Sequence, residues 1–201
     1  MSKSVGNLSN LLISLGIFFL VSPFIPIILS ELNFWWHATT SRHISNVQPK
    51  VVEGFRIYIP KLSLSSNVIP EVNPFDSEAY LPALKNGVAH ALGSALPDQA
   101  GTVYLFAHST DAPWRLTQYN AQFYLLHQLQ PDDLIYLDYQ GSRYTYQIKR
   151  KQVINSTAVD YLTSSQKHSE LILQTCWPPG TTWKRLLVLA DLIWNSLIKS
   201  L

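Results

Sequence analysis

The chain of 201 residues has a single cysteine, Cys176, and few charged side chains. One cysteine cannot form a disulfide framework within the chain, and it excludes a zinc site built from several cysteines. Charged residues make up 14% of the sequence, against roughly 25% in an average soluble domain. The formal net charge is only +2, and Lys and Arg form no run longer than the three residues 149–151, which argues against a nucleic-acid partner. No cluster of residues has the spacing of metal ligands, so we expect neither a metal nor an organic cofactor.

A long uncharged stretch near the N-terminus accounts for part of the apolar excess. No charged residue occurs from Leu11 to Leu29, and at about 1.5 Å per residue a helix of this length nearly spans the roughly 30 Å hydrocarbon core of a bilayer. A cleaved signal peptide would have a small-residue cleavage site, which is not found here. A buried core helix would show a polar face, and this stretch shows almost none. We therefore expect a membrane anchor over residues 11–29.

The charges beside the stretch indicate its orientation. Lys3 precedes it, while the first basic residue after it is Arg42. By the positive-inside rule, residues 1–10 are then a short cytoplasmic N-terminus and the main body lies outside the cell, on a single-pass protein of the cell membrane.

The remainder of the chain predicts a linker, a β-rich domain and a tail. Residues 30–53 are polar without clear periodicity, as in a linker. Residues 54–190 contain short segments rich in β-branched and aromatic residues, which is typical of strands. The clearest are Phe55–Ile59, Leu62–Ser65, Thr102–Ala107, a hairpin with arms Leu134–Tyr139 and Arg143–Ile148, Leu171–Thr175 and Leu186–Ala190.

Between these strands, Tyr119–Gln130 has helical spacing, with Phe123, Leu126 and Leu129 on one side. Many short strands with few helices predict a mainly β domain, either a closed barrel or a sandwich. Residues 191–201 form a short apolar tail, for which we expect either a helix that covers the domain or a segment on the membrane surface.

Three residues combine reactive chemistry with a position at a predicted strand end. Cys176 ends an apolar strand directly before a Pro/Gly turn, which holds a thiol rigidly but leaves it accessible. The turn would return the chain so that Arg185 lies near the sulfur, where a cation favours thiolate and stabilises an oxyanion. His108 follows another apolar strand, and its near-neutral pKa suits proton transfer. Taken alone, Cys176 is equally consistent with a buried structural cysteine, Arg185 fits a surface residue at a strand edge better, and His108 could be an ordinary loop histidine. The joint pattern is therefore the stronger signal.

These stretches resemble sortases. The family's cysteine motif is Thr-Leu-x-Thr-Cys followed by an Arg on the next strand, and Leu173-Gln174-Thr175-Cys176 with Arg185 matches it. Ile172 replaces the first Thr, and Ala107 stands before His108 where the family usually has Gly. The short interval from cysteine to arginine resembles the pilin-type class C enzymes, but no lid segment with an Asp-Pro-aromatic motif is present, so the class stays open.

The resemblance covers about residues 55–190 and implies a fold, a site and a reaction. The fold would be a closed sortase-type β-barrel of about eight strands with short helices, preceded by one transmembrane helix. His108, Cys176 and Arg185 would be catalytic, and Thr175 would lie in the substrate groove. His90 falls in a matching stretch, but as a strand or loop residue and not a catalytic one.

By the same resemblance, the enzyme would cleave a Leu-Pro-x-Thr-Gly-like sorting signal between Thr and Gly through a thioester. It would then transfer the acyl group to an amine of the cell wall or of a protein lysine. Its partners would be the sorting-signal peptide, the amine acceptor and membrane lipid.

Other functions are weaker fits to the sequence. Papain-like hydrolases place the cysteine before the histidine, L,D-transpeptidases carry a Ser/Thr-His-Gly-Cys motif that is missing, and a disulfide exchanger needs Cys-x-x-Cys. A degenerate, non-catalytic membrane-tethered β-domain that binds envelope peptides remains the alternative. It explains the anchor and the strands, but not the order of His108, Cys176 and Arg185.

Overall fold

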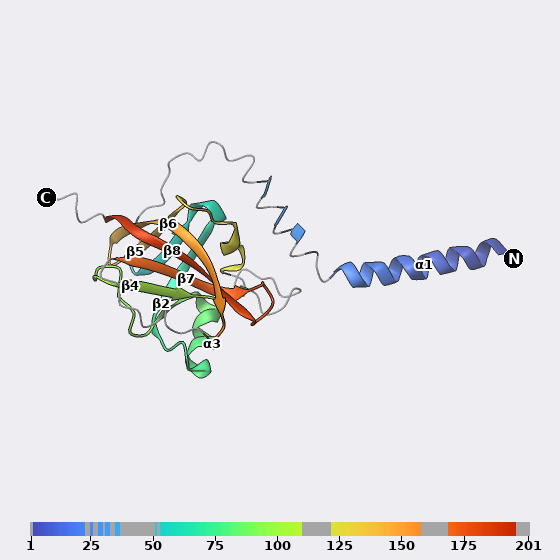
Figure 1. Ribbon diagram of the computed structural model, residues 1–201. Coiled ribbons are helices and arrows are strands. Elements are labelled where there is room, and N and C mark those ends of the chain that lie inside the picture. Colours follow the sequence, from blue (N-terminus) through green and yellow to red (C-terminus); the bar gives the residue numbers. More distant parts are fainter. Residues whose placement is uncertain are drawn as a thin grey trace.

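Eight strands close into a barrel in the computed structural model (Figure 1), which describes residues 2–22, 25, 28–29, 31–32, 35–36, 51, 53–109, 122–157 and 169–195. The strands are β1 (Phe55–Ile59), β2 (Leu64–Val72), β3 (Val88–Ala91), β4 (Thr102–Phe106), β5 (Leu134–Tyr139), β6 (Ser142–Asn155), β7 (Glu170–Trp177) and β8 (Lys184–Asn195). The helices are α1 (Ser2–Val21), α3 (Ser77–Asn86) and the short 3-10 helices η2 (Pro60–Leu62) and η4 (Tyr124–Gln128).

The strands follow the order β1-β2-β3-β4-β7-β8-β6-β5 around the barrel. Two neighbouring pairs, β2–β3 and β4–β7, are parallel, and the others are antiparallel. Aliphatic and aromatic side chains from every strand fill the core, and many of them are fully buried. The mainly β prediction and the closed barrel of about eight strands are confirmed.

Several strands differ from the prediction: β2 runs from Leu64 to Val72 instead of Leu62–Ser65, β3 was not predicted, and two later strands are longer than expected. β6 continues from the hairpin to Asn155, and β8 continues to Asn195, and the two pair along almost their whole length. The exposed charged side chains in the middle of β6 hid this strand, because they break the alternating pattern on which the prediction rested. Residues 191–195 therefore belong to the barrel and not to a separate tail, and residues 196–201 lie outside the described residues.

The helices also differ from expectation. The predicted helical segment 119–130 contains only the single turn η4, and residues 119–121 lie outside the described part. Helix α3 was not predicted, although Asp76 caps it by accepting a hydrogen bond from Glu78 N at 2.9 Å. Gly87 ends it at a place where a Cβ would lie 2.3 Å from Asn67 O. Only glycine fits there, since β3 begins directly against β2.

A buried ion pair fixes the register of the β5–β6 hairpin. Asp138 and Arg143 are directly opposed in the two strands. Arg143 donates from Nε to Asp138 Oδ1 at 2.6 Å and from Nη2 to Oδ2 at 2.8 Å. This two-point contact satisfies both charges within the barrel wall, and a slip by one residue would separate them.

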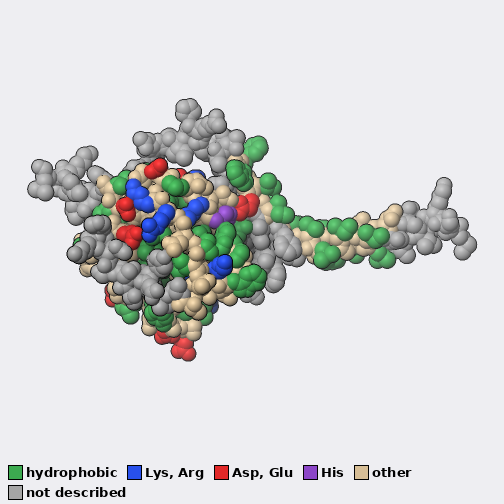
Figure 2. Space-filling model, in the orientation of Figure 1, with side chains coloured by type: hydrophobic (Ala, Val, Ile, Leu, Met, Phe, Trp, Pro, Cys, Tyr) green, Lys and Arg blue, Asp and Glu red, His purple; other side chains and the backbone are tan. Residues whose placement is uncertain are grey.

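Helix α1 projects away from the barrel (Figure 1), and hydrophobic side chains lie along the part of it from Leu11 to Val21 (Figure 2). It covers the first part of the predicted anchor, residues 11–29, of which the second part is only partly described. Among the described residues, no helix is both long enough and apolar enough to cross a lipid bilayer. Most of the predicted linker, residues 30–53, lies outside the described residues.

His90 is a fully buried histidine of β3 that connects three segments of the barrel. Its Nδ1 accepts a hydrogen bond from Glu71 N at 3.3 Å, so the ring hydrogen is on Nε2, which lies 3.1 Å from Ala95 O. Ser94 Oγ lies 2.9 Å from the same nitrogen and also accepts a hydrogen bond from Tyr104 N. Burial lowers the pKa of His90 from 6.5, and the hydrogen bond to Ala95 and the charge of Glu71 partly oppose this effect. His90 is thus a structural residue.

We expect His90 to make stability fall in acid. Because the folded state holds this ring neutral, only the unfolded chain takes up the proton as the pH falls below 6.5. The contribution is fully present above that pH and is lost on the way down to the folded-state pKa. Urea unfolding of the wild type and of His90→Asn between pH 7.5 and 5 measures it: the wild type should lose more stability over this range. Equal pH slopes in the two proteins would contradict the assignment.

Candidate functional site

The site begins with two strand ends that meet at one rim of the barrel. β4 and β7 are parallel neighbours in the register Phe106↔Gln174, so their carboxyl ends lie side by side. His108 follows the end of β4, and Cys176 is the penultimate residue of β7. Both side chains are half-buried. The parallel pairing therefore brings together a thiol and an imidazole that are far apart in the sequence.

Arg185 lies directly across from Cys176. β7 and β8 pair antiparallel with Cys176 opposite Arg185, and opposed residues of such a pair have Cα atoms about 4.5–5.5 Å apart. Arg185 Nη1 donates to Thr182 O and to Lys184 O, each at 3.1 Å. These two carbonyls orient the guanidinium beside the cysteine. No carboxylate among the described residues forms an ion pair with it.

Thr175 ties the two strand ends together. Its side chain is 3% exposed, and Oγ1 donates to Ala107 O at 3.0 Å. Ala107 N in turn donates to Gln174 O at 3.2 Å, which extends the pairing beyond the last residue of β4. On the other side, His108 O accepts from Phe123 N at 3.1 Å. The backbone that carries His108 is therefore held from both directions.

A cavity of about 350 Å³ opens over this rim, and all four predicted site residues, His108, Thr175, Cys176 and Arg185, line it. The opposite wall comes from α3 through Tyr80, Leu81 and Leu84, and from the β7–β8 loop through residues 180–182. The sequence analysis missed this wall because it missed α3. Asp76 and Gly87 were the available signals, as typical residues before and after a helix, while Pro82 inside the helix masked them.

A buried tyrosine forms a second polar contact at the site that the sequence did not reveal. Tyr104 of β4 is 1% exposed, and its hydroxyl donates to Gln174 Oε1 at 2.6 Å. Burial raises the pKa of Tyr104 well above its usual range, and the positive charge of Arg185 partly opposes this effect. Tyr104 therefore stays protonated and remains a hydrogen-bond donor at any working pH.

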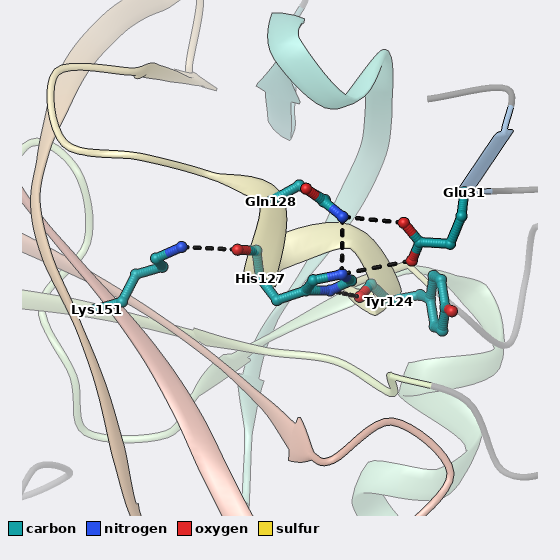
Figure 3. A network of polar contacts seen from close by, with 5 residues as sticks. All are labelled: Glu31, Tyr124, His127, Gln128 and Lys151. Atoms are coloured by element: carbon teal, nitrogen blue, oxygen red, sulfur yellow. Dashed lines mark hydrogen bonds and ion pairs between the residues drawn. The ribbon is translucent and has the colours of Figure 1, made fainter. Parts of the chain in front are cut away.

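The N-terminal segment reaches the barrel close to the cysteine strand (Figure 3). Glu31 accepts a hydrogen bond from Gln128 Nε2 at 2.9 Å, and its other oxygen lies 3.4 Å from His127 Nε2. Lys151 donates to His127 O at 2.7 Å and so holds η4 against β6. The His127 ring packs against Trp177 with centroids 5.6 Å apart. Trp177 directly follows Cys176, so one histidine contacts both the N-terminal segment and the cysteine strand.

The arrangement suits acyl transfer through a covalent intermediate. A thiol, a proton carrier and a fixed cation surround a cavity large enough for a peptide segment. A family model, described as the sortase domain, matches residues 57–193. The chain belongs to the sortase family. The resemblance to sortases stated from the sequence is thereby confirmed.

Individual sortases show the extent of the similarity. Sortase D of Bacillus subtilis (strain 168) is 28% identical over 113 residues, which cover 55% of this chain and 52% of that protein. The chain thus spans about half the length of this curated relative.

Solved sortase structures share the fold. Sortase C-1 from Actinomyces oris has a TM-score of 0.58 and 24% identity over 79% of this chain and 82% of that one. Sortase C-3 from Streptococcus pneumoniae has a TM-score of 0.59 and 20% identity over 87% of this chain and 85% of that one. Sortase A from Listeria monocytogenes has a TM-score of 0.56 and 20% identity over 73% of this chain and 90% of that one.

The contribution of the Thr175–Ala107 hydrogen bond to stability can be measured with Thr175→Val. The substitution keeps the shape but leaves Ala107 O without its donor, which should lower the free energy of unfolding by about 1–2 kcal/mol. Urea denaturation of the full-length sortase measures this loss. Thr181→Val is the matched control, because the Thr181 hydroxyl bonds only to Pro178 O within an exposed loop. Equal stabilities of the two variants would show that the Thr175 bond does not hold the strand ends.

Proposed function

We propose that this sortase is a membrane-anchored transpeptidase that cleaves a Leu-Pro-x-Thr-Gly-like sorting signal and transfers the acyl part to an amine. Cys176 is the nucleophile, His108 carries the proton and Arg185 stabilises the oxyanion. The observation that supports this most directly is that these three side chains line one cavity, with Cys176 and Arg185 opposed in neighbouring strands. Cys176 and Arg185 also match the sortase motif, with Ile172 in place of its first Thr, and His108 follows Ala107 in place of the usual Gly.

The reaction proceeds in two balanced steps. Cys176 Sγ attacks the carbonyl carbon of the Thr–Gly bond, and the resulting oxyanion lies beside the Arg185 guanidinium. The C–N bond breaks as His108 gives its proton to the leaving amine, and a thioester remains. An incoming amine from the cell wall or a protein lysine then attacks the thioester and gives a proton to His108. The C–S bond breaks and the Cys176 thiolate returns.

Membrane attachment is proposed through the segment from Leu11 to Leu29. The large hydrophobic side chains at positions 11–21 of α1 are between 47% and 73% exposed. The transfer of apolar surface of this extent from water to lipid lowers the free energy, which favours membrane attachment. The charge distribution described above then gives an extracellular barrel, where the sorting signal and the acceptor amine occur.

The covalent intermediate provides the main test. The full-length chain, in mild detergent, is incubated with a panel of Leu-Pro-x-Thr-Gly peptides and examined by intact mass. We expect a peptide-sized adduct on the wild type that an added amine releases, and none on Cys176→Ala. An adduct that persists on Cys176→Ala contradicts the nucleophile. No adduct with any peptide, together with a thiol that iodoacetamide does not modify, favours the non-catalytic peptide-binding domain.

The proposed role of Arg185 predicts a loss in kcat. Removal of one oxyanion donor typically lowers kcat by about 10²–10³-fold, so Arg185→Ala should release the amine product at least a hundredfold more slowly. Arg150→Ala is the control, because Arg150 is an exposed residue of β6 outside the cavity. If Arg185→Ala has the kcat of the wild type, the proposed role of the arginine in stabilising the oxyanion would be contradicted.

A further inference from the structure

Gln174 shares the face of β7 that carries Cys176. Side chains two positions apart in a strand point to the same side, and each residue advances the chain by about 3.3 Å. Gln174 lines the cavity together with Cys176 and lies about 7 Å from it along the strand. An extended peptide has the same spacing, so Gln174 faces the ligand about two residues away from the carbonyl that Cys176 attacks.

Tyr104 determines how the Gln174 amide is oriented. A buried tyrosine hydroxyl needs an acceptor, and Gln174 Oε1 at 2.6 Å is the acceptor found here. The Arg185 charge acts on the Tyr104 oxygen, which favours a hydroxyl whose hydrogen points away from the arginine and toward the glutamine. The carbonyl oxygen of the Gln174 amide is therefore occupied by a hydrogen bond from the barrel wall.

The other end of the amide is available to a ligand. Nε2 carries two hydrogens, and within the described residues it forms no hydrogen bond. Because Oε1 is held by a side chain that is 1% exposed, the donor end is the part of the amide that a molecule in the cavity meets. Nε2 can therefore donate a hydrogen bond to a backbone carbonyl oxygen of an extended peptide.

We propose that Gln174 Nε2 recognises a backbone carbonyl oxygen of the acyl-donor peptide, and that Tyr104 is the residue that positions it. Gln174 occupies the unspecified position x of the sortase motif Thr-Leu-x-Thr-Cys, so it tunes substrate binding without taking part in the bond changes at Cys176. The inference rests on the proposed function in taking a peptide as the ligand.

The test separates binding from chemistry by using Cys176→Ala as the background. Binding of fluorescein-labelled Leu-Pro-x-Thr-Gly peptides to the full-length chain is followed by anisotropy. Gln174→Glu keeps an acceptor for Tyr104 but removes the donor, and Gln174→Met removes both. Each should raise the Kd roughly threefold to tenfold, the size expected for one lost hydrogen bond. Tyr104→Phe should raise the Kd in the same direction, because the amide is no longer oriented.

Controls separate recognition from structural damage. Gln152→Glu makes the same change on β6 outside the cavity and should leave the Kd unchanged. In the chain that retains Cys176, the uncharged Gln174→Met variant should raise KM with kcat unchanged, and iodoacetamide should modify its thiol at the wild-type rate. A general distortion of the site would change kcat and the alkylation rate as well.

The outcomes distinguish this inference from the proposed function. Wild-type Kd in both Gln174 variants, or no binding of any peptide to Cys176→Ala, overturns the inference. If the Gln174 variants form the adduct with the KM of the wild type, the proposed transpeptidase reaction would be supported, and Gln174 would have no role in peptide recognition. Peptide binding that depends on Gln174, without any adduct on the wild type, would instead support recognition and contradict the proposed reaction.

Discussion

The parallel pairing of β4 with β7 is the constraint on which the rest of the site depends. Parallel neighbours end at the same rim, so the residue after β4 and the last residues of β7 meet. The antiparallel return of β8 then places Arg185 opposite Cys176. A barrel with a different strand order would contain the same three side chains without bringing them to one cavity.

Hydrogen bonds from the barrel wall hold this rim in position. Thr175 bonds to Ala107 O, Tyr104 to Gln174, and Arg185 to two carbonyls of its own loop. Each of these contacts joins a side chain at the cavity to a rigid strand or to a tight loop. The proposed acyl transfer would not require these groups to be reorganised, which is how a closed barrel suits a reaction that develops charge on an oxyanion.

The wall beside the cysteine strand also includes the N-terminal segment. Glu31 contacts His127 and Gln128 of η4, and His127 packs on Trp177. Glu31, which precedes the barrel, and Trp177, which follows Cys176, thus both contact His127. In the proposed membrane-anchored protein, this contact would link the barrel to the segment that follows the anchor.

The sequence alone was sufficient to predict the features that depend on residues close together in the chain. The alternating strands, the helix-like uncharged N-terminal stretch and the sortase motif around Cys176 were recognisable because each depends on neighbouring residues. The extensions of β6 and β8 were not, because they are stabilised by pairing with each other while their exposed charges break the pattern. Helix α3, with a proline inside it, was hidden in the same way.

Only the tertiary structure decided what surrounds the reactive residues. The contact between Tyr104 and Gln174 joins residues 70 positions apart, and that between Glu31 and Gln128 joins residues 97 apart. No spacing rule connects such positions, since their distance is set by strand order and register. The sequence determined which side chains are available for chemistry, and the closure of the barrel determined which of them share a cavity.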